Sequence, residues 1–252
     1  MSSEQWFYLL LLFARFTAAI AVLPIFSMRG MPVLLKAGFG AIFAYLLFIA
    51  STQEAAPPPH LLTYVLTVAS EVLVGLTLGL LVLFFFTAAR IAGQFVDLTM
   101  GLAQASIFDP QYGSQVTLFG QFYYLFALAL YFSVNGHHYL FKGLAQSIKL
   151  VPPGGAVLQA ALMPRFLAYF SQMFTIAFQL AAPVIIVLVI SELALGLLGK
   201  TVPQLNVFMV GMPLKVGVGL LVIYIIFPYL AQVITTVFDT LHQNLQSLLA
   251  LL

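Results

Sequence analysis

The chain has 252 residues, of which 63% are hydrophobic and 6% are charged, against roughly 45–50% and about 25% in soluble domains. These proportions exclude an ordinary soluble domain and predict an integral membrane protein in one membrane-embedded unit. The net charge of +2 comes from scattered residues, which argues against nucleic acid as a partner, and the absence of cysteine excludes disulfides and thiolate catalysis.

Six apolar segments follow one another along the chain. They cover residues 6–26, 34–50, 61–89, 117–134, 166–198 and 214–238. About 20 mostly apolar residues suffice for a helix to cross the hydrocarbon of a bilayer, so we expect an all-α membrane protein of about six helical segments. The first segment lacks the basic region and cleavage site of a signal peptide, and we expect it to be a retained helix.

A polar interruption separates the third and fourth apolar segments. Residues 97–115 mix small and amide side chains around Asp109-Pro110. Such a stretch is unsuited to a lipid-facing helix, because unsatisfied peptide groups cost several kcal/mol each in hydrocarbon. We therefore expect a loop that lies either outside the bilayer or inside a pore.

Charged side chains occur inside or against the apolar runs. They are Arg15, Glu71, Arg90, Asp97 and Glu192. Facing them to lipid would cost on the order of 15 kcal/mol in total, at about 3 kcal/mol each. They must contact protein or water, either as ion pairs between packed helices or along an interface or passage. The two interpretations are compatible.

Small residues indicate where helices approach closely. Gly75 and Gly79 lie four apart, one turn after Glu71, and Glu192, Gly196 and Lys200 repeat that spacing. The two surrounding strings, residues 70–76 and 191–197, share Ser, Glu, Gly and a final Leu. This similarity indicates either an internal duplication or coincidence in a leucine-rich chain.

Motifs for enzymatic chemistry are weak in this sequence. Residues 194–201, ALGLLGKT, satisfy a relaxed phosphate-loop pattern, but apolar helix flanks them and we expect a helix C-terminus instead. His137 and His138 have no nearby cysteine or carboxylate that would complete a zinc site, so we expect them at a turn formed by Asn135-Gly136. We therefore expect no enzyme, no metal and no cofactor.

A series of residues along the whole chain resembles a known family. Its most specific part is ELALG at 192–196, followed by PQLNVF at 203–208 and by Gly211, Pro213 and Lys215. Earlier members of the series, in chain order, are Arg15, Pro24, Phe26, Pro32, Lys36, Glu71, Gly75, Gly79, Ala92, Gly93, Gln94, Met100, Gly101, Asp109, Pro110, Asn135, Gly136, His137, His138, Ser147, Val151 and Pro152. The sequence resembles the FliR/SctT family of type III export gate proteins, and the Asn-Gly-His-His run favours its flagellar branch.

The resemblance implies an architecture and partners. Members of the family assemble with FliP and FliQ into a helical hetero-oligomer around a pore, which FlhB wraps. They lie in the flagellar basal body of the bacterial inner membrane, and unfolded flagellar proteins leave through the pore. A member is similar to a FliP-like part joined to a FliQ-like helical hairpin, which here correspond to residues 1–165 and 166–252.

The resemblance also implies functional residues. The pore-closing plug of the family falls on residues 104–115, where the candidate gating residues are Gln104, Ser106, Phe108, Asp109, Pro110, Gly113 and Ser114. Contacts between helices or subunits are expected at Arg15, Glu71, Gly75, Gly79, Arg90, Asp97, Glu192, Gly196, Asn206 and Lys215. Both arguments, from polarity and from resemblance, converge on the 104–115 loop.

Other interpretations of the sequence stay open. The broken apolar segments, the two similar strings and the intramembrane carboxylates are also typical of a small secondary transporter. A transporter predicts a complex of identical subunits with solute-dependent proton coupling. An inert structural component of the membrane predicts assembly without a pore.

Overall fold

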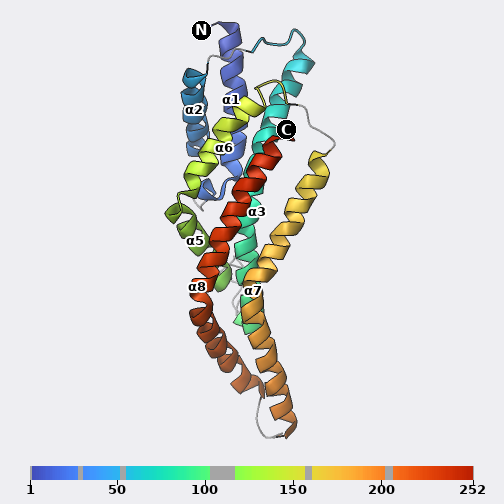
Figure 1. Cartoon of the computed structure of the whole chain (residues 1–252). Helices are drawn as coiled ribbons and strands as arrows, with labels where there is room; N and C mark the ends of the chain where they lie inside the picture. Colours follow the sequence, from blue (N-terminus) through green and yellow to red (C-terminus); the bar gives the residue numbers. More distant parts are fainter. Residues whose placement is uncertain are drawn as a thin grey trace. The chain divides into compact units, whose positions relative to one another are not determined.

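The computed structural model describes residues 2–27, 31–51, 55–102, 117–156, 161–201 and 207–251. Within these residues the chain forms seven α-helices and one 3₁₀ turn, and no strand (Figure 1). The elements are α1 (Ser3–Val22), η1 (Pro24–Phe26), α2 (Val33–Ala50), α3 (Leu61–Met100), α5 (Leu118–Ser133), α6 (Gly136–Leu150), α7 (Leu162–Thr201) and α8 (Val207–Leu249). The expected all-α class is confirmed.

The apolar segments correspond to helices that suit a membrane. Among the described residues, five helices are long and apolar enough to cross a bilayer: α1, α2, α3, α7 and nearly all of α8. A sixth span is possible if α5 and α6 are counted together. The expected number of about six segments therefore agrees with the structure, and each of the six predicted segments overlaps one helix.

Two details of the sequence interpretation were wrong. The polar interruption was expected to begin at Asp97, but α3 continues to Met100, because Asp97 is bound by backbone groups of α5 and is not exposed to lipid. Residues 136–150, which hydropathy left without a helix, form α6. Asn135 adopts a left-handed conformation (φ 57°) before α6, so His137 and His138 lie in a helical first turn after that residue.

The fold excludes a phosphate loop at residues 194–201, which match its sequence pattern. Residues 194–201 lie wholly within α7, which ends at Thr201. A phosphate loop requires a strand before it and a helix that begins at its lysine, and α7 supplies neither. The expectation of a helix C-terminus is therefore confirmed.

The helices divide into two compact units. Unit 1 comprises Met1–Phe84, Asn135–Phe170 and Asp239–Leu252, and unit 2 comprises Phe85–Val134 and Ser171–Phe238. Consequently α3, α7 and α8 each contribute residues to both units.

Unit 1 is built on α1. Ser2 and Gln5 form a reciprocal capping box that satisfies two amide groups at the start of this helix. The buried face of α1 carries Leu11, Leu12 and Phe16, each at most 1% exposed. Helix α1 packs against α2, beside which it runs in Figure 1.

Helix α1 also contacts α3 at the two glycines that the small-residue spacing singled out. A Cβ atom at Gly75 would collide with the carbonyl oxygen of Arg15, and one at Gly79 would lie 2.7 Å from the carbonyl oxygen of Ala19. Because the obstructing atoms belong to the backbone, they have little freedom to move aside. Glycine at these positions lets the two helix backbones approach closely.

Unit 2 is centred on a cluster of aromatic rings. The rings of Phe86, Tyr131 and Phe238 come from α3, α5 and α8, and their centroids lie 4.9–5.7 Å apart. All three side chains are at most 2% exposed. Edge-to-face and tilted ring pairs at these distances add to the hydrophobic gain of burial, so this cluster fixes the three helices of the unit.

A glycine comparison tests the close contact between α1 and α3. The substitution Gly75→Ala should lower the stability of the chain by about 1–3 kcal/mol, because the new methyl group meets an immobile carbonyl. The substitution Gly143→Ala places the same methyl group in open space within α6 and should leave stability unchanged or raise it by up to about 1 kcal/mol. Thermal unfolding of both variants in detergent checks this. Equal effects of the two substitutions would contradict the packing argument.

Candidate functional site

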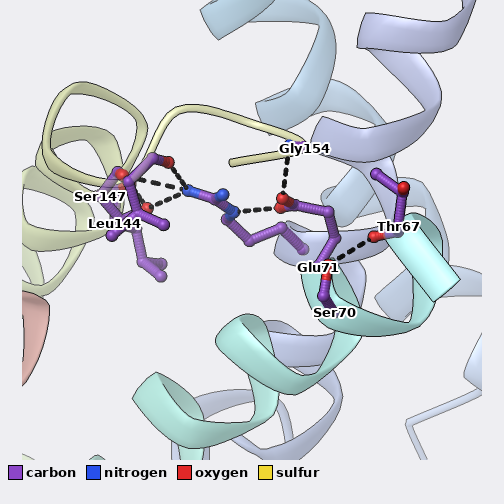
Figure 2. A network of polar contacts seen from close by, with 8 residues as sticks. Thr67, Ser70, Glu71, Leu144, Ser147 and Gly154 are labelled. Carbon is purple, nitrogen blue, oxygen red and sulfur yellow. Dashed lines mark hydrogen bonds and ion pairs between the residues drawn. The ribbon is translucent and has the colours of Figure 1, made fainter. Parts of the chain in front are cut away.

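A buried ion pair lies in unit 1, between the first and third helices. The Arg15 Nε atom of α1 donates to the Glu71 Oε2 atom of α3 over 2.5 Å, and both side chains are fully buried. Figure 2 shows Ser147 of α6 on one side of the guanidinium group and Glu71 on the other, with Gly154 beside Glu71. The two charges therefore neutralise each other at a place without access to solvent.

Further hydrogen bonds extend the pair into a network. Arg15 Nη1 donates to the carbonyl oxygens of Ser147 and Val151, at 3.0 and 2.9 Å, near the C-terminus of α6. The Glu71 Oε1 atom accepts from the backbone N–H of Gly154, at 2.9 Å. Because the last carbonyl groups of a helix lack partners within the helix, the guanidinium both satisfies them and complements the helix dipole. The network thus ties α1, α3 and the end of α6 together.

A second buried carboxylate lies in unit 2. Asp97 of α3 is 1% exposed, and its Oδ2 atom accepts hydrogen bonds from the backbone N–H groups of Phe119 and Gly120 at 2.9 and 3.1 Å. These amides belong to the first turn of α5. The carboxylate is therefore held by the N-terminus of a helix, where negative charge is favoured.

Arg90, about two helix turns before Asp97, makes a different contact. Its guanidinium carbon lies 4.2 Å from the centre of the Tyr124 ring on α5, while much of the residue stays exposed. A cation over an aromatic face gains about 0.5–1 kcal/mol at exposed sites. Arg90 and Asp97 thus both connect α3 to α5 within unit 2.

A third pair of charges joins α7 to α8 within unit 2. Lys215 Nζ lies 3.0 Å from Glu192 Oε1, and the Glu192 side chain is 65% exposed whereas that of Lys215 is 20% exposed. The pair borders an open cleft of about 550 Å³ at the C-terminal end of α3. The cleft is lined by Leu98, Thr99, Met100, Gly101, Glu192, Leu195, Gly196, Gly211, Met212 and Lys215.

The expected interface residues thus fall into separate groups. Arg15, Glu71, Gly75 and Gly79 meet at the contact of α1 with α3, and Arg90 and Asp97 meet α5. Glu192, Gly196 and Lys215 border the cleft, and a Cβ at Gly196 would meet open space. Asn206 and all seven candidate gating residues, Gln104 to Ser114, lie outside the described residues. A role of any of these residues in contacts between subunits stays a prediction.

Some members of these sites were not predicted from the sequence. Most partners of Arg15 and Asp97 are backbone groups, which leave no side-chain signature: the carbonyls of Ser147 and Val151 for Arg15, and the amides of Phe119 and Gly120 for Asp97. The hydroxyl of Ser147 is the side-chain partner of Arg15 Nη1, at 3.3 Å. The sequence indicated a turn at Gly154, because this residue lies in the run Pro152-Pro153-Gly154-Gly155. In the structure its φ is +84°, a conformation that favours glycine.

The chemistry available at these sites is structural. Arg15, Glu71, Arg90, Asp97, Glu192 and Lys215 are engaged in ion pairs, hydrogen bonds to a helix N-terminus or ring contacts. Among the described residues, no group of three or more His, Asp and Glu side chains could hold a metal ion. These contacts hold the helices in position, and the Glu192–Lys215 pair stays exposed at the border of the cleft.

Comparison with known proteins gives consistent results over the whole chain. The family model for bacterial export proteins, family 1, matches residues 6–241. The flagellar biosynthetic protein FliR of Bacillus subtilis (strain 168) is 39% identical, covering 96% of this chain and 94% of the relative. FliR of Escherichia coli (strain K12) is 30% identical, covering 99% and 97%. The Yop proteins translocation protein T of Yersinia pestis is 31% identical, covering 85% and 84%.

A double-mutant cycle tests the buried ion pair. Arg15→Met or Glu71→Met alone should destabilise the chain by about 3–5 kcal/mol, since each leaves an uncompensated buried charge. The double variant should be more stable than either single variant, because it removes both charges together. Thermal unfolding in detergent supplies the four stabilities.

The exposed pair of Glu192 and Lys215 in unit 2 is the matched control for the buried pair. Glu192→Met should change stability by no more than about 1 kcal/mol in the isolated chain, because solvent screens an exposed pair. Additive effects of the two single substitutions in unit 1 would show that Arg15 and Glu71 do not stabilise each other.

Proposed function

Because this chain belongs to the bacterial export proteins, family 1, as a FliR homologue, we propose that it forms part of a pore through which unfolded flagellar proteins are exported. The chain is a membrane component of the flagellar type III export apparatus and a transport component, not an enzyme. The proposal adds the pore, its partner subunits and its place in the flagellar basal body of the inner membrane.

The observation that carries this proposal is an exposed carboxylate in a stretch of α7 whose apolar side chains are also exposed. Glu192 is largely exposed, and its neighbours Ile190, Leu193 and Leu197 are exposed by 61–65%. Apolar side chains tolerate lipid, but a carboxylate at membrane depth is costly there even beside a lysine. A surface of this composition suits a neighbouring protein subunit or a water-filled passage.

The exposure of whole helices supports assembly as well. In α2, only 11% of the most apolar window is buried inside the chain, and in α8 only 17%. Helices with so few internal contacts have large surfaces left for lipid or for other subunits. We propose that FliP and FliQ cover part of these surfaces in a helical hetero-oligomer and that FlhB contacts this assembly.

In the proposed assembly, the two parts of the chain correspond to two different partner subunits. Residues 1–165 form the FliP-like part and residues 166–252 the FliQ-like hairpin in this proposal. Its support is that α7 and α8, of 40 and 43 residues, follow each other with five residues between them and are linked by the Glu192–Lys215 pair.

The segment 104–115 is proposed as the plug of the resting pore. Its small and amide side chains, around Asp109-Pro110, would seal the pore against ions and move aside when a substrate enters. The described flanks agree with a position at a passage: α3 ends at Met100 beside the cleft of unit 2, and α5 begins at Leu118.

The transporter alternative finds less support in the geometry. A secondary transporter needs intramembrane carboxylates that exchange protons or bind solute. Glu71 is fully buried against Arg15, and Asp97 is held by two backbone amides, so both are engaged in holding helices. These contacts favour a component of an assembly over a solute carrier.

Purification of the chain with its neighbours tests the assembly. We expect a tagged chain, extracted in mild detergent from its native membrane, to retain FliP and FliQ, which mass spectrometry identifies. A tagged membrane protein unrelated to export, expressed at the same level, controls for unspecific recovery. Recovery of the chain alone, or only with copies of itself, would contradict the proposal.

Ion leakage tests the plug. Deletion of residues 109–113 should raise ion conductance of the assembled gate, because the shortened segment no longer fills the pore. The measurement is membrane depolarisation in cells that express FliP, FliQ and the variant chain. The same deletion in cells without FliP is the control and should cause no leakage. Unchanged conductance in the assembled gate would remove the segment from the seal.

A further inference from the structure

The guanidinium group of Arg90 lies at the surface of unit 2, and no carboxylate in the described part of that unit forms an ion pair with it. Two carboxylates occur among the described residues of unit 2. That of Asp97 is 1% exposed and accepts hydrogen bonds from backbone amides of α5, and that of Glu192 pairs with Lys215. Both are engaged elsewhere, so the positive charge of Arg90 is left for another molecule to neutralise.

Tyr124 holds the guanidinium group at one place on this surface. The guanidinium carbon lies 4.2 Å from the centre of the Tyr124 ring, and Tyr124 is 8% exposed and packs edge-on against Phe86. A cation that is already fixed on a buried ring loses less side-chain freedom when a partner binds. Its N–H donors suit an anion that offers two oxygens, either a carboxylate or the phosphate of a lipid.

Helices α3 and α5 run antiparallel beside Arg90. Phe86 contacts Tyr131, with 5.3 Å between the ring centroids. Arg90, about one turn further along α3, contacts Tyr124, which lies about two turns earlier on α5. Positions after Arg90 on α3 and positions after Tyr124 on α5 therefore lie on opposite sides of the guanidinium group along the helix axes.

Exposed apolar side chains occur on both of these sides. Leu98 follows Arg90 by eight residues on α3 and is 65% exposed. Phe132 follows Tyr124 by eight residues on α5 and is 43% exposed. At a rise of about 1.5 Å per residue, each lies about 12 Å from the level of the guanidinium group. The exposed apolar surface therefore continues past the charge in both directions.

A lipid bilayer does not match this order of apolar, charged and apolar groups. The headgroup region is roughly 5–8 Å thick on each side of the hydrocarbon core. A lipid phosphate at Arg90 would therefore leave either Leu98 or Phe132 beyond the headgroups, in water. Hydrocarbon over both would instead enclose the guanidinium group, where an ionised side chain is costly. An apolar protein surface that carries one carboxylate matches all three positions.

We propose that this face of α3, with Arg90 and Gln94, binds a helix of another subunit of the export apparatus, which presents an aspartate or glutamate side chain to Arg90. Gln94 lies about one turn after Arg90 on the same face and is exposed, so it borders the same contact. The inference rests on the proposed function in one respect, which is that the chain assembles with other subunits of the apparatus.

A photo-activated cross-linker on this face identifies what lies against it. Gln94 is replaced by benzoylphenylalanine in the tagged chain, Arg90 stays intact, and membranes of cells that carry the whole apparatus are irradiated. We expect a product with FliP, FliQ or FlhB, in which mass spectrometry finds an aspartate or glutamate within about one helix turn of the cross-link. No product, a product only with lipid or with this chain itself, or a peptide without acidic residues would overturn the proposal.

Charge reversal measures the contribution of the ion pair. Arg90→Glu should lower the recovery of the cross-linked subunit with the tagged chain at least about tenfold, because two like charges then face each other. Lys142→Glu is the matched control, since Lys142 is an exposed basic residue of α6 in unit 1, and it should leave recovery unchanged. Equal recovery with the two variants would overturn the proposal.

A charge swap completes the test. Replacing the acidic residue of the cross-linked peptide by lysine should restore the recovery of that subunit with the Arg90→Glu chain. Failure of every acidic position in the peptide to restore recovery would overturn the proposal.

The original chain distinguishes failure of this inference from failure of the proposed function. If the original chain retains FliP and FliQ and Arg90→Glu retains them equally well, the inference alone is overturned. If the original chain is recovered without them, the assembly is contradicted and the inference with it. Thermal unfolding of the isolated Arg90→Glu chain shows whether this variant folds. If it does not, the cross-link from Gln94 still decides, because Arg90 is intact there.

Discussion

The burial of charge is the constraint on which this structure depends. Arg15 and Glu71 are fully buried in a chain that is 63% hydrophobic, and the desolvation of each is offset by the other and by hydrogen bonds with Ser147, Val151 and Gly154. The pair therefore specifies one arrangement of α1, α3 and α6, since any shift leaves a charge without a partner. The glycines of α3 allow the close approach of α1 that this arrangement requires.

The ion pairs of the two units differ in their solvent exposure, and this difference agrees with the proposed function. In unit 1 the network is closed and inaccessible, which suits a rigid part. In unit 2 the Glu192–Lys215 pair borders an open cleft and exposes a carboxylate beside leucines and isoleucines. The chain is a component of an export apparatus, and we propose that other molecules of that apparatus cover this surface.

Much of the fold was predictable from hydropathy, because long apolar runs at membrane depth leave helix as the available structure. Helix α6 was missed because it is amphipathic: Leu140, Leu144 and Ile148 are buried at helical spacing, but the polar residues between them keep its 15 residues from forming a long apolar run. The charged residues were predicted to contact protein or water, and Arg15, Glu71 and Asp97 are buried in protein, but their partners were not predicted. Arg15 donates mainly to the backbone carbonyls of Ser147 and Val151, and Asp97 accepts from backbone amides of α5. Every residue carries such groups, so the sequence does not single these partners out. The sequence shows that a charged residue in an apolar segment needs a partner, but only the fold shows where that partner lies.

The distances in sequence across the buried network have a consequence for biosynthesis. Glu71 follows Arg15 by 56 residues, and Val151 follows Arg15 by 136. At about 5–20 residues per second, the ribosome needs roughly 7–27 s to make the Val151 carbonyl group that completes the arginine's bonds. During this interval the nascent N-terminal helix carries an incompletely bonded guanidinium, so its insertion requires water, lipid headgroups or a chaperoning membrane insertase to shelter the charge.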